Sequence, residues 1–250
     1  MAKEFVIEQL KLTFQDRDSF SREELWDFYR IYEPNLIEGT LGWRIYHLKE
    51  KKIIRSIKKG IYTLSYKPVY KPEIDNKQRD LFLKINKQFI DIKACIWTTR
   101  GLSEFMLHIP SKNSIIVEVE NDAIETVFHF LKDANVKNVF LQPTEKEMEM
   151  YVYELEDPII IKSLVTKSPL KKQKKVSSPL LEKILVDVFS DKIVFNAFQG
   201  NELSTIFNNA YNKYEINFSK LLTYAKRRGK EKEIIDFMIS KTNISNTLFK

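Results

Sequence analysis

Glycine, histidine and cysteine are scarce in this sequence of 250 residues, and each scarcity excludes a class of site. The six glycines include neither a G-x-G-x-x-G nor a G-x-x-x-x-G-K spacing, so the sequence has no glycine-rich phosphate loop. The three histidines lie far apart and lack the spacing of zinc ligands. The single cysteine, Cys95, cannot form an intrachain disulfide, and its apolar neighbours favour a buried, unreactive thiol. We therefore expect no bound metal and no cofactor.

Catalytic and membrane patterns are missing as well. The sequence has no G-x-S-x-G elbow and no Cys/His pair typical of a nucleophilic site, so we expect no catalytic residues and no enzyme. No run approaches the roughly 18 apolar residues that a membrane span requires. The first residues also lack the pattern of a signal peptide. These absences predict a cytoplasmic protein without a membrane partner.

Positive charge is what the sequence has in excess. It holds 41 Lys and Arg residues against 34 Asp and Glu residues, a formal net charge of +7. A basic protein favours acidic partners, of which nucleic acid is the leading candidate. The clustering of the charge is more informative than its total, since positions 38–59 hold seven Lys and Arg residues against two acids.

This basic stretch belongs to a segment, residues 20–64, whose pattern is typical of a winged helix-turn-helix. Ser21 and Glu24 have the spacing of a capping box and predict the start of a helix. Residues 33–35 (EPN) combine a proline with turn-forming neighbours and predict its end. With an amphipathic helix before it, the segment predicts a DNA-binding domain over residues 1–66.

A second helix is predicted over residues 38–51. Leu41, Ile45 and Leu48 recur at the spacing of a buried helical stripe. Two short strands should follow, joined by a tight turn for which Gly60 supplies the backbone freedom. The predicted helix and hairpin together form the reading helix and the wing of the motif.

The predicted DNA contacts lie on the side of this helix away from its buried stripe and on the basic hairpin. Side chains that donate hydrogen bonds, stack or carry positive charge are the types that contact base edges and phosphates. Trp43 and His47 allow another interpretation, because a tryptophan often packs in a core and a lone histidine often lies on a solvated surface. The predicted DNA-binding residues are Thr40, Trp43, Arg44, His47, Lys51, Arg55, Lys58 and Lys59.

A proline-containing linker, residues 67–75, separates this module from the rest of the chain. Residues 76–250 predict an α/β segment followed by a helical C-terminal region, so the fold class is α+β. Strands are predicted at 89–97, 115–119, 136–141, 150–155 and 159–161, and helices are predicted to be capped by Asn121, Ser178 with Pro179, and Asn217.

Residues 162–178 contain lysines and no acid, and predict an exposed basic linker. Such a segment is either a solvated loop or a second contact for phosphate or RNA. The helix dipole already explains why cations lie at the end of the helix that follows Asn217, because its negative end favours positive charge. These cations are therefore weaker candidates for ligand contact. The predicted second basic patch is Lys171, Lys172, Lys174, Lys175, Lys226, Arg227 and Arg228.

Two alternatives from other functional classes remain. Asp91, Glu118 and Glu120 could hold Mg²⁺ on neighbouring strands, as in a nuclease, although alternating acids also occur on a half-exposed strand. A winged helix can also serve as a protein-interaction adaptor. Loss of Mg²⁺-dependent cleavage on Glu118→Ala substitution would support the nuclease, and an absence of salt-sensitive DNA binding would support the adaptor.

Four segments resemble the AbiEi family of antitoxins and transcriptional regulators: residues 39–48 (GTLGWRIYHL), 53–64 (IIRSIKKGIYTL), 178–187 (SPLLEKILVD) and 217–229 (NFSKLLTYAKRRG). The resemblance implies a repressor that binds inverted repeats in double-stranded DNA ahead of its own operon. It also implies the antitoxin role in a type IV toxin–antitoxin, or abortive infection, system. The C-terminal region would counteract a nucleotidyltransferase toxin encoded next door, which the antitoxin need not contact directly.

Overall fold

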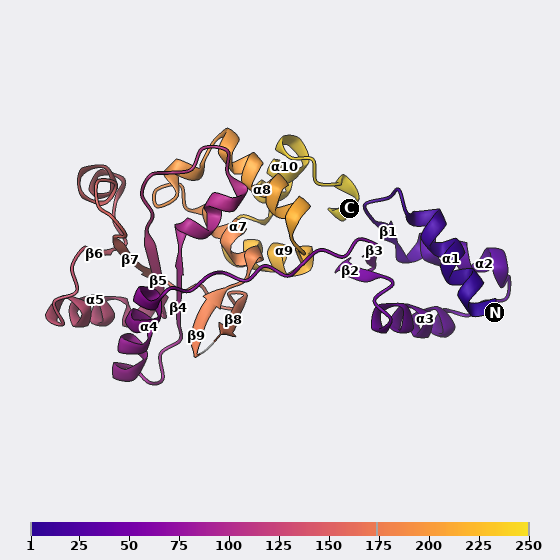
Figure 1. Cartoon of the computed structure of the whole chain (residues 1–250), viewed down its shortest axis with the longest axis horizontal. Coiled ribbons are helices and arrows are strands. Elements are labelled where there is room, and N and C mark those ends of the chain that lie inside the picture. Colours follow the sequence, from indigo (N-terminus) through magenta and orange to yellow (C-terminus); the bar gives the residue numbers. More distant parts are fainter. Residues whose placement is uncertain (1, 174, 250) are drawn as a thin grey trace.

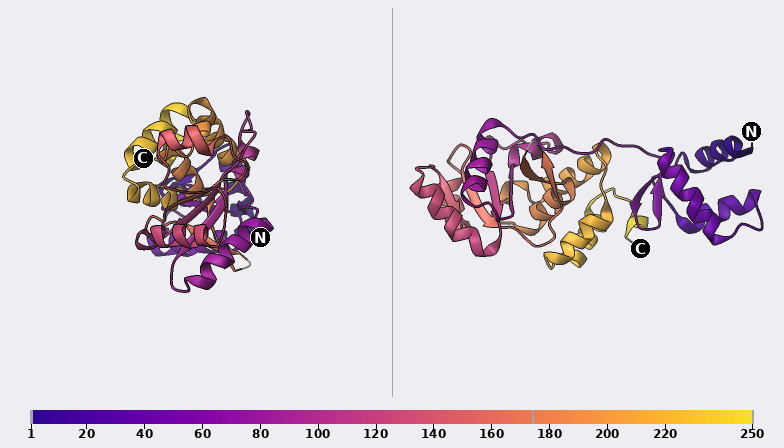
Figure 2. Two further views of the ribbon diagram at one scale, coloured as in Figure 1. Left: turned by 90° about the vertical axis from the view of Figure 1, so that its left-hand side faces the viewer. Right: turned by 90° about the horizontal axis from the view of Figure 1, so that it is seen from below.

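A computed structural model describes residues 2–173 and 175–249. The chain is α+β and elongated, with the N-terminal module at one end, the α/β segment at the other and the C-terminal helices between them (Figure 1). The view from below in Figure 2 shows how narrow the region is where the N-terminal module meets the rest of the chain. No helix among the described residues combines the length and the apolar character needed to cross a membrane.

The N-terminal module alternates helices with short strands. Phe14 stacks on Phe20 with ring centroids 4.1 Å apart, and the stripe predicted from Leu41, Ile45 and Leu48 is buried beside them. β1, β3 and β2 pair in that order as an antiparallel sheet. The elements are α1 (Ala2–Phe14), β1 (Phe20–Ser21), α2 (Arg22–Tyr32), α3 (Glu38–Glu50), β2 (Arg55–Lys58) and β3 (Ile61–Thr63).

Local signals in the sequence predicted where several of these elements begin. The Ser21 side chain accepts a hydrogen bond from the Glu24 backbone N–H at 3.0 Å, and the Glu24 carboxylate accepts one from the Ser21 N–H at 2.7 Å. The capping box is therefore confirmed. Gly60 has a φ of 78° between β2 and β3, a left-handed conformation that glycine adopts without strain.

The α/β segment is built around one mixed sheet. β4, β5, β7 and β6 pair in that order; β4 runs antiparallel to β5, whereas β5, β7 and β6 are parallel. α4 and α5 cover one face with an apolar cluster, and the C-terminal helices pack on the other. The elements are α4 (Asn76–Gln88), β4 (Ala94–Thr98), η1 (Thr99–Phe105), β5 (Ile115–Val119), η2 (Asn121–Ala123), α5 (Ile124–Asp133), β6 (Val139–Leu141), α6 (Glu145–Glu147), η3 (Met148–Val152) and β7 (Ile159–Ser163).

The C-terminal region begins with an antiparallel hairpin and continues with helices that share one large core with the sheet. Asn217 caps α9 by accepting from the Lys220 N–H at 3.1 Å, as predicted, and Gly229 follows the helix with a φ of 67°. The elements are β8 (Leu170–Gln173), β9 (Val176–Pro179), α7 (Leu181–Ser190), η4 (Asn196–Phe198), α8 (Asn201–Lys213), α9 (Phe218–Arg227), α10 (Glu231–Lys241) and η5 (Asn246–Leu248).

Several predicted elements are wrong. Residues 150–155 do not form a strand, because η3 is a π-helix in which Met148 and Val152 face the core. Residues 162–178 are not a linker, since β8 and β9 pair there as a hairpin. Ser178 and Pro179 therefore end a strand, and α7 begins at Leu181 without a side-chain cap.

Three further boundaries differ from the prediction. The strand predicted over residues 89–97 is formed only from Ala94 onward, and the strand predicted over residues 136–141 is formed only from Val139 onward. Asn121 begins the short 3-10 helix η2, and α5 starts after it without a side-chain cap. At these boundaries, apolar side chains that lie outside the strand or helix still pack on the sheet. Because the apolar pattern continues past the end of the regular structure, the predicted elements were too long.

Candidate nucleic-acid interface

The outer face of α3 is exposed and aromatic. Trp43 is 55% exposed and Tyr46 is 58% exposed, so the alternative in which Trp43 packs in the core is wrong. The rings of Trp43 and His47 meet edge to face with centroids 3.9 Å apart, and the Tyr46 ring meets His47 edge to face at 5.7 Å. Open space lies next to Gly39, where an added Cβ would meet nothing within 4 Å. This face therefore offers stacking and hydrogen-bonding groups to a partner.

Tyr46 is an exposed residue of this face that is not among the predicted contacts. At about 100° per residue, Tyr46, Gly39 and Trp43 follow one another around the helix on the face opposite the buried stripe. The spacing of Tyr46 from Leu41 and Ile45 could have identified it, because residues one or five positions apart do not share a face of a helix.

Arg44 is not a free cation on this face. Its guanidinium donates to both carboxylate oxygens of Glu33, at 2.6 and 2.5 Å, and lies 4.7 Å from the centroid of the Tyr29 ring. The side chain is 20% exposed. Arg44 therefore fastens α3 to the end of α2, and a base contact would require it to leave this carboxylate.

The remaining predicted contacts of α3 line a groove rather than the outermost surface. This groove, of about 710 Å³, runs between α3 and the first turns of α1. Thr40 and His47 are half-buried along it, and Lys51 is exposed at its end. Phe5 and Tyr32 supply its apolar wall.

The predicted wing does not project as a free basic tip. Arg55 is 11% exposed, its Nη1 lies 3.1 Å from Glu215 Oε1, and its Nε donates to the Ser65 carbonyl at 2.7 Å. The Lys59 backbone N–H donates to Ser219 Oγ at 3.3 Å. Ile57 is buried in the core of the C-terminal region rather than in that of the N-terminal module.

The hairpin is thus docked on α9, which lies beside β2 and β3 (Figure 1). The prediction that Arg55 is exposed for phosphate contact is wrong. Ile57 is buried, and the neighbouring Arg55 guanidinium pairs with the Glu215 carboxylate. Lys58 is half-buried and Lys59 keeps its side chain exposed. The β2–β3 hairpin therefore connects the N-terminal module to the C-terminal region.

The second basic patch is divided between separate elements. Lys171 and Lys172 are exposed on β8, Lys175 is exposed in the turn that follows, and Lys174 lies outside the described residues. Lys226 and Arg227 are exposed at the end of α9. Arg228, by contrast, is 17% exposed and lies 3.7 Å from the Asp187 carboxylate, so it belongs to an interior network.

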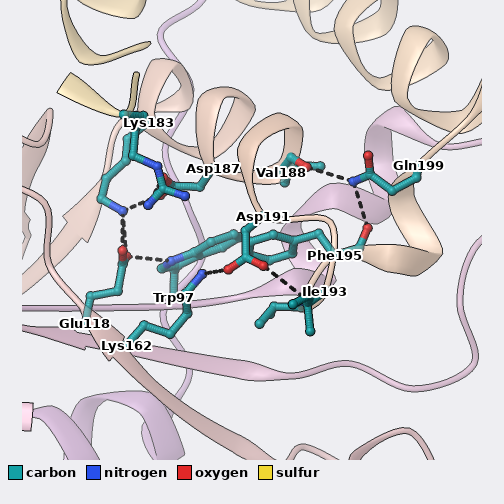
Figure 3. A network of polar contacts seen from close by, with 12 residues as sticks. Trp97, Glu118, Lys162, Lys183, Asp187, Val188, Asp191, Ile193, Phe195 and Gln199 are labelled. Carbon is teal, nitrogen blue, oxygen red and sulfur yellow. Dashed lines mark hydrogen bonds and ion pairs between the residues drawn. The ribbon is translucent and has the colours of Figure 1, made fainter. Parts of the chain in front are cut away.

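That interior network is centred on Lys183 of α7, which is fully buried (Figure 3). Its Nζ donates to Glu118 Oε1 and Oε2 of β5, at 2.7 and 2.6 Å, and also to Asp187 Oδ2. Trp97 Nε1 donates to Glu118 at 3.2 Å, and the Tyr224 hydroxyl donates to Asp187 at 2.8 Å. These contacts join the sheet to α7 and α9.

Charge balance explains how the network tolerates burial. Burial alone would lower the pKa of Lys183, but the carboxylates of Asp187 and Glu118 raise it well above its usual range. Two cations, Lys183 and Arg228, face the two carboxylates. Burial also raises the pKa of the neighbouring Cys95 thiol, which agrees with an unreactive cysteine.

The same contacts contradict the nuclease alternative, in which Asp91, Glu118 and Glu120 would hold Mg²⁺ together. The Glu118 carboxylate is occupied by Lys183, Asp91 is exposed in the turn before β4, and Glu120 pairs with Lys93 at 3.5 Å. Within residues 2–173 and 175–249, no three His, Cys, Asp or Glu side chains converge to hold a metal ion. The predicted acids do not form one site.

Comparison with known proteins places the chain in a family. The profile of a family of unknown function, DUF6577, matches residues 40–244. The chain belongs to this family. The matched range begins in α3 and includes the docked hairpin, the mixed sheet and the Lys183 network. No curated protein and no solved structure matches the chain.

Proposed function

We propose that the chain is a DNA-binding transcriptional regulator whose α3 enters the major groove. The observation that carries this proposal is the order α1–β1–α2–α3–β2–β3 with the antiparallel pairing β1-β3-β2, which we interpret as a winged helix. In that arrangement the helix before the hairpin is the reading helix, and its outer face here is exposed.

The groups on and around α3 suit this task. Tyr46 and His47 can donate to base edges, and Trp43 can contact sugars or thymine methyl groups. Lys49, Lys51 and the loop residue Lys52 are exposed at the end of the helix and can meet phosphates. Because the hairpin is docked on α9, Arg55 is a weaker candidate for phosphate contact than these lysines.

The antitoxin role is the narrower part of the proposal and rests on the resemblance to the AbiEi family. On this proposal the chain binds inverted repeats ahead of its own operon and counteracts a nucleotidyltransferase toxin. Growth rescue on co-expression with a nucleotidyltransferase encoded beside the gene tests it. Continued toxicity in the presence of the full chain would overturn this part alone.

The DNA-binding part is tested by titrating the full chain into labelled duplex from the region upstream of its gene. We expect tighter binding than to a shuffled duplex, and a steep loss of affinity as salt rises, because displaced counterions drive association. Equal affinity for both duplexes, or no salt dependence, would overturn the proposal.

A protein-interaction adaptor is the second candidate, and one observation favours it. The N-terminal module exposes large apolar side chains around the groove beside α3, among them Phe5 at 52% and Trp43 at 55%. The same titration separates the two candidates, because an adaptor would show no salt-sensitive binding to duplex DNA.

A further inference from the structure

A hollow of about 800 Å³ opens among the C-terminal helices, away from α3. It lies where the end of α7, the first turn of α8, the end of α9 and one side of α10 meet. Its volume is within the range of sites for small organic ligands, roughly 300–1,000 Å³. The polar network of Figure 3 borders it through Asp191, Ile193 and Gln199.

Positive charge dominates the lining. Its cations are Lys192, Arg228, Lys230 and Lys241, and its acids are Asp191 and Glu233. Both acids already have partners, because Asp191 pairs with Lys162 and Glu233 pairs with Lys230 at 2.8 Å. Lys192 and Lys241 are exposed and pair with no other described residue. The hollow therefore carries cations that its own acids do not neutralise.

Two features of the wall point to an anion. The first turn of α8, a helix of 13 residues, borders the hollow at Gly200 and Asn201, and no side chain caps it. Its first N–H groups lack acceptors within the helix, and the helix dipole favours negative charge there. Independently, the Ser190 hydroxyl oxygen is buried in the lining without a hydrogen-bond partner in the described structure.

Part of the lining is apolar. Phe189 and Phe237 both line the hollow, are partly exposed, and have ring centroids 5.3 Å apart. Aromatic faces of this kind stack with planar heterocycles. A ligand that contacts both the cations and the aromatic rings has an anionic group and a planar group within one small molecule.

We propose that this hollow binds a nucleotide. The phosphate lies at the first turn of α8 with Lys192 and Lys241 as its cations, and the base lies against Phe189 and Phe237. The inference does not depend on the DNA-binding proposal, because no residue of the N-terminal module lines the hollow. It assigns the C-terminal region a small-molecule effector.

Calorimetric titration of the full chain with AMP, inorganic phosphate and adenosine tests this site. We expect AMP to bind more tightly than phosphate, phosphate to compete with AMP, and adenosine to bind weakest. The Lys192→Ala/Lys241→Ala double variant should lose about tenfold in AMP affinity, because two charge-assisted contacts are removed.

The matched control is Lys226→Ala/Arg227→Ala, which removes exposed cations of α9 that do not line the hollow. This variant should bind AMP like the unaltered chain. Absence of AMP binding, unchanged affinity in the Lys192/Lys241 variant, or an equal loss in the control would overturn the site. Equal affinities for AMP and phosphate would overturn its assignment to a nucleotide.

Discussion

The Arg55 guanidinium of the hairpin lies 3.1 Å from the Glu215 carboxylate, next to the start of α9. The linker reinforces this joint, because the Glu215 N–H donates to the Pro68 carbonyl at 2.9 Å and Lys67 Nζ donates to the Tyr211 carbonyl at 2.6 Å. The N-terminal module is thus connected to the C-terminal region through packed and charged contacts.

Glu215→Ala should lower the free energy of unfolding by about 1–2 kcal/mol, because it leaves the largely buried Arg55 without its carboxylate. It should also speed proteolysis within residues 67–75, since the linker contacts Glu215 and the end of α8 at this joint. Urea unfolding and limited proteolysis measure the two effects. Glu125→Ala, an exposed site on α5, is the control, and equal behaviour of both variants would contradict the prediction.

On the proposed DNA-binding function, Tyr46→Ala and His47→Ala should each weaken binding to the upstream duplex by about 1–3 kcal/mol. Arg44→Ala should act differently, lowering the free energy of unfolding by about 1 kcal/mol, because it breaks the partly exposed pair with Glu33. Anisotropy titration and urea unfolding separate these effects. Lys84→Ala on the distant α4 is the control, and binding unaffected by the α3 substitutions would exclude α3 as the reading helix.

Lys183→Met should destabilise the fold by about 3–5 kcal/mol, because it leaves the carboxylates of Glu118 and Asp187 buried without a cation between them. The triple variant Lys183→Met/Glu118→Gln/Asp187→Asn removes those charges as well and should recover part of the loss. Unfolding by guanidinium chloride measures both. A single variant as stable as the unaltered chain would show that the network contributes nothing.

The same network predicts how stability depends on pH at the alkaline end. The folded pKa of Lys183 is raised above its ordinary value of 10.5, so its stabilising contribution is complete below that pH. It is lost as the pH rises through the raised pKa, because the folded protein then gives up the proton that it binds more tightly. Unfolding curves measured at rising alkaline pH should show this loss, and the triple variant should lack it.

Cys95 should resist Ellman's reagent in the folded protein and react fully once urea unfolds it. The thiol is buried, and burial raises its pKa, so both access and thiolate formation are suppressed. Absorbance of the released thiolate follows the reaction. A folded-state rate that equals the unfolded-state rate would contradict burial of this side chain.

Local signals predicted the parts of the fold that depend on neighbouring residues. The capping box of Ser21 and Glu24, the Asn217 cap and the left-handed Gly60 are all confirmed, because each depends on residues a few positions apart. The same method failed at residues 150–155, where apolar spacing suits a strand or a helical turn equally and packing decides.

The candidate site could be predicted only in part, because packing also decides which of its side chains are exposed. Periodicity identified the buried side of α3, but it placed Arg44 among free contacts because Glu33 and Tyr29 approach it only after α2 and α3 pack. It also assigned Arg55 to an exposed wing, although its partner lies far along the chain.

The sequence by itself determined the caps, the turns, the buried stripe of α3 and the excess of positive charge, because these depend on composition or on short spacings. Only the tertiary structure decided which charges remain available to a partner. Lys183 meets Glu118 across 65 positions, and Lys59 meets Ser219 across 160. Contacts at such separations form when sheet, helices and hairpin pack together, and that packing moves Arg55 and Arg228 inward while it leaves Tyr46, Lys192 and Lys241 exposed.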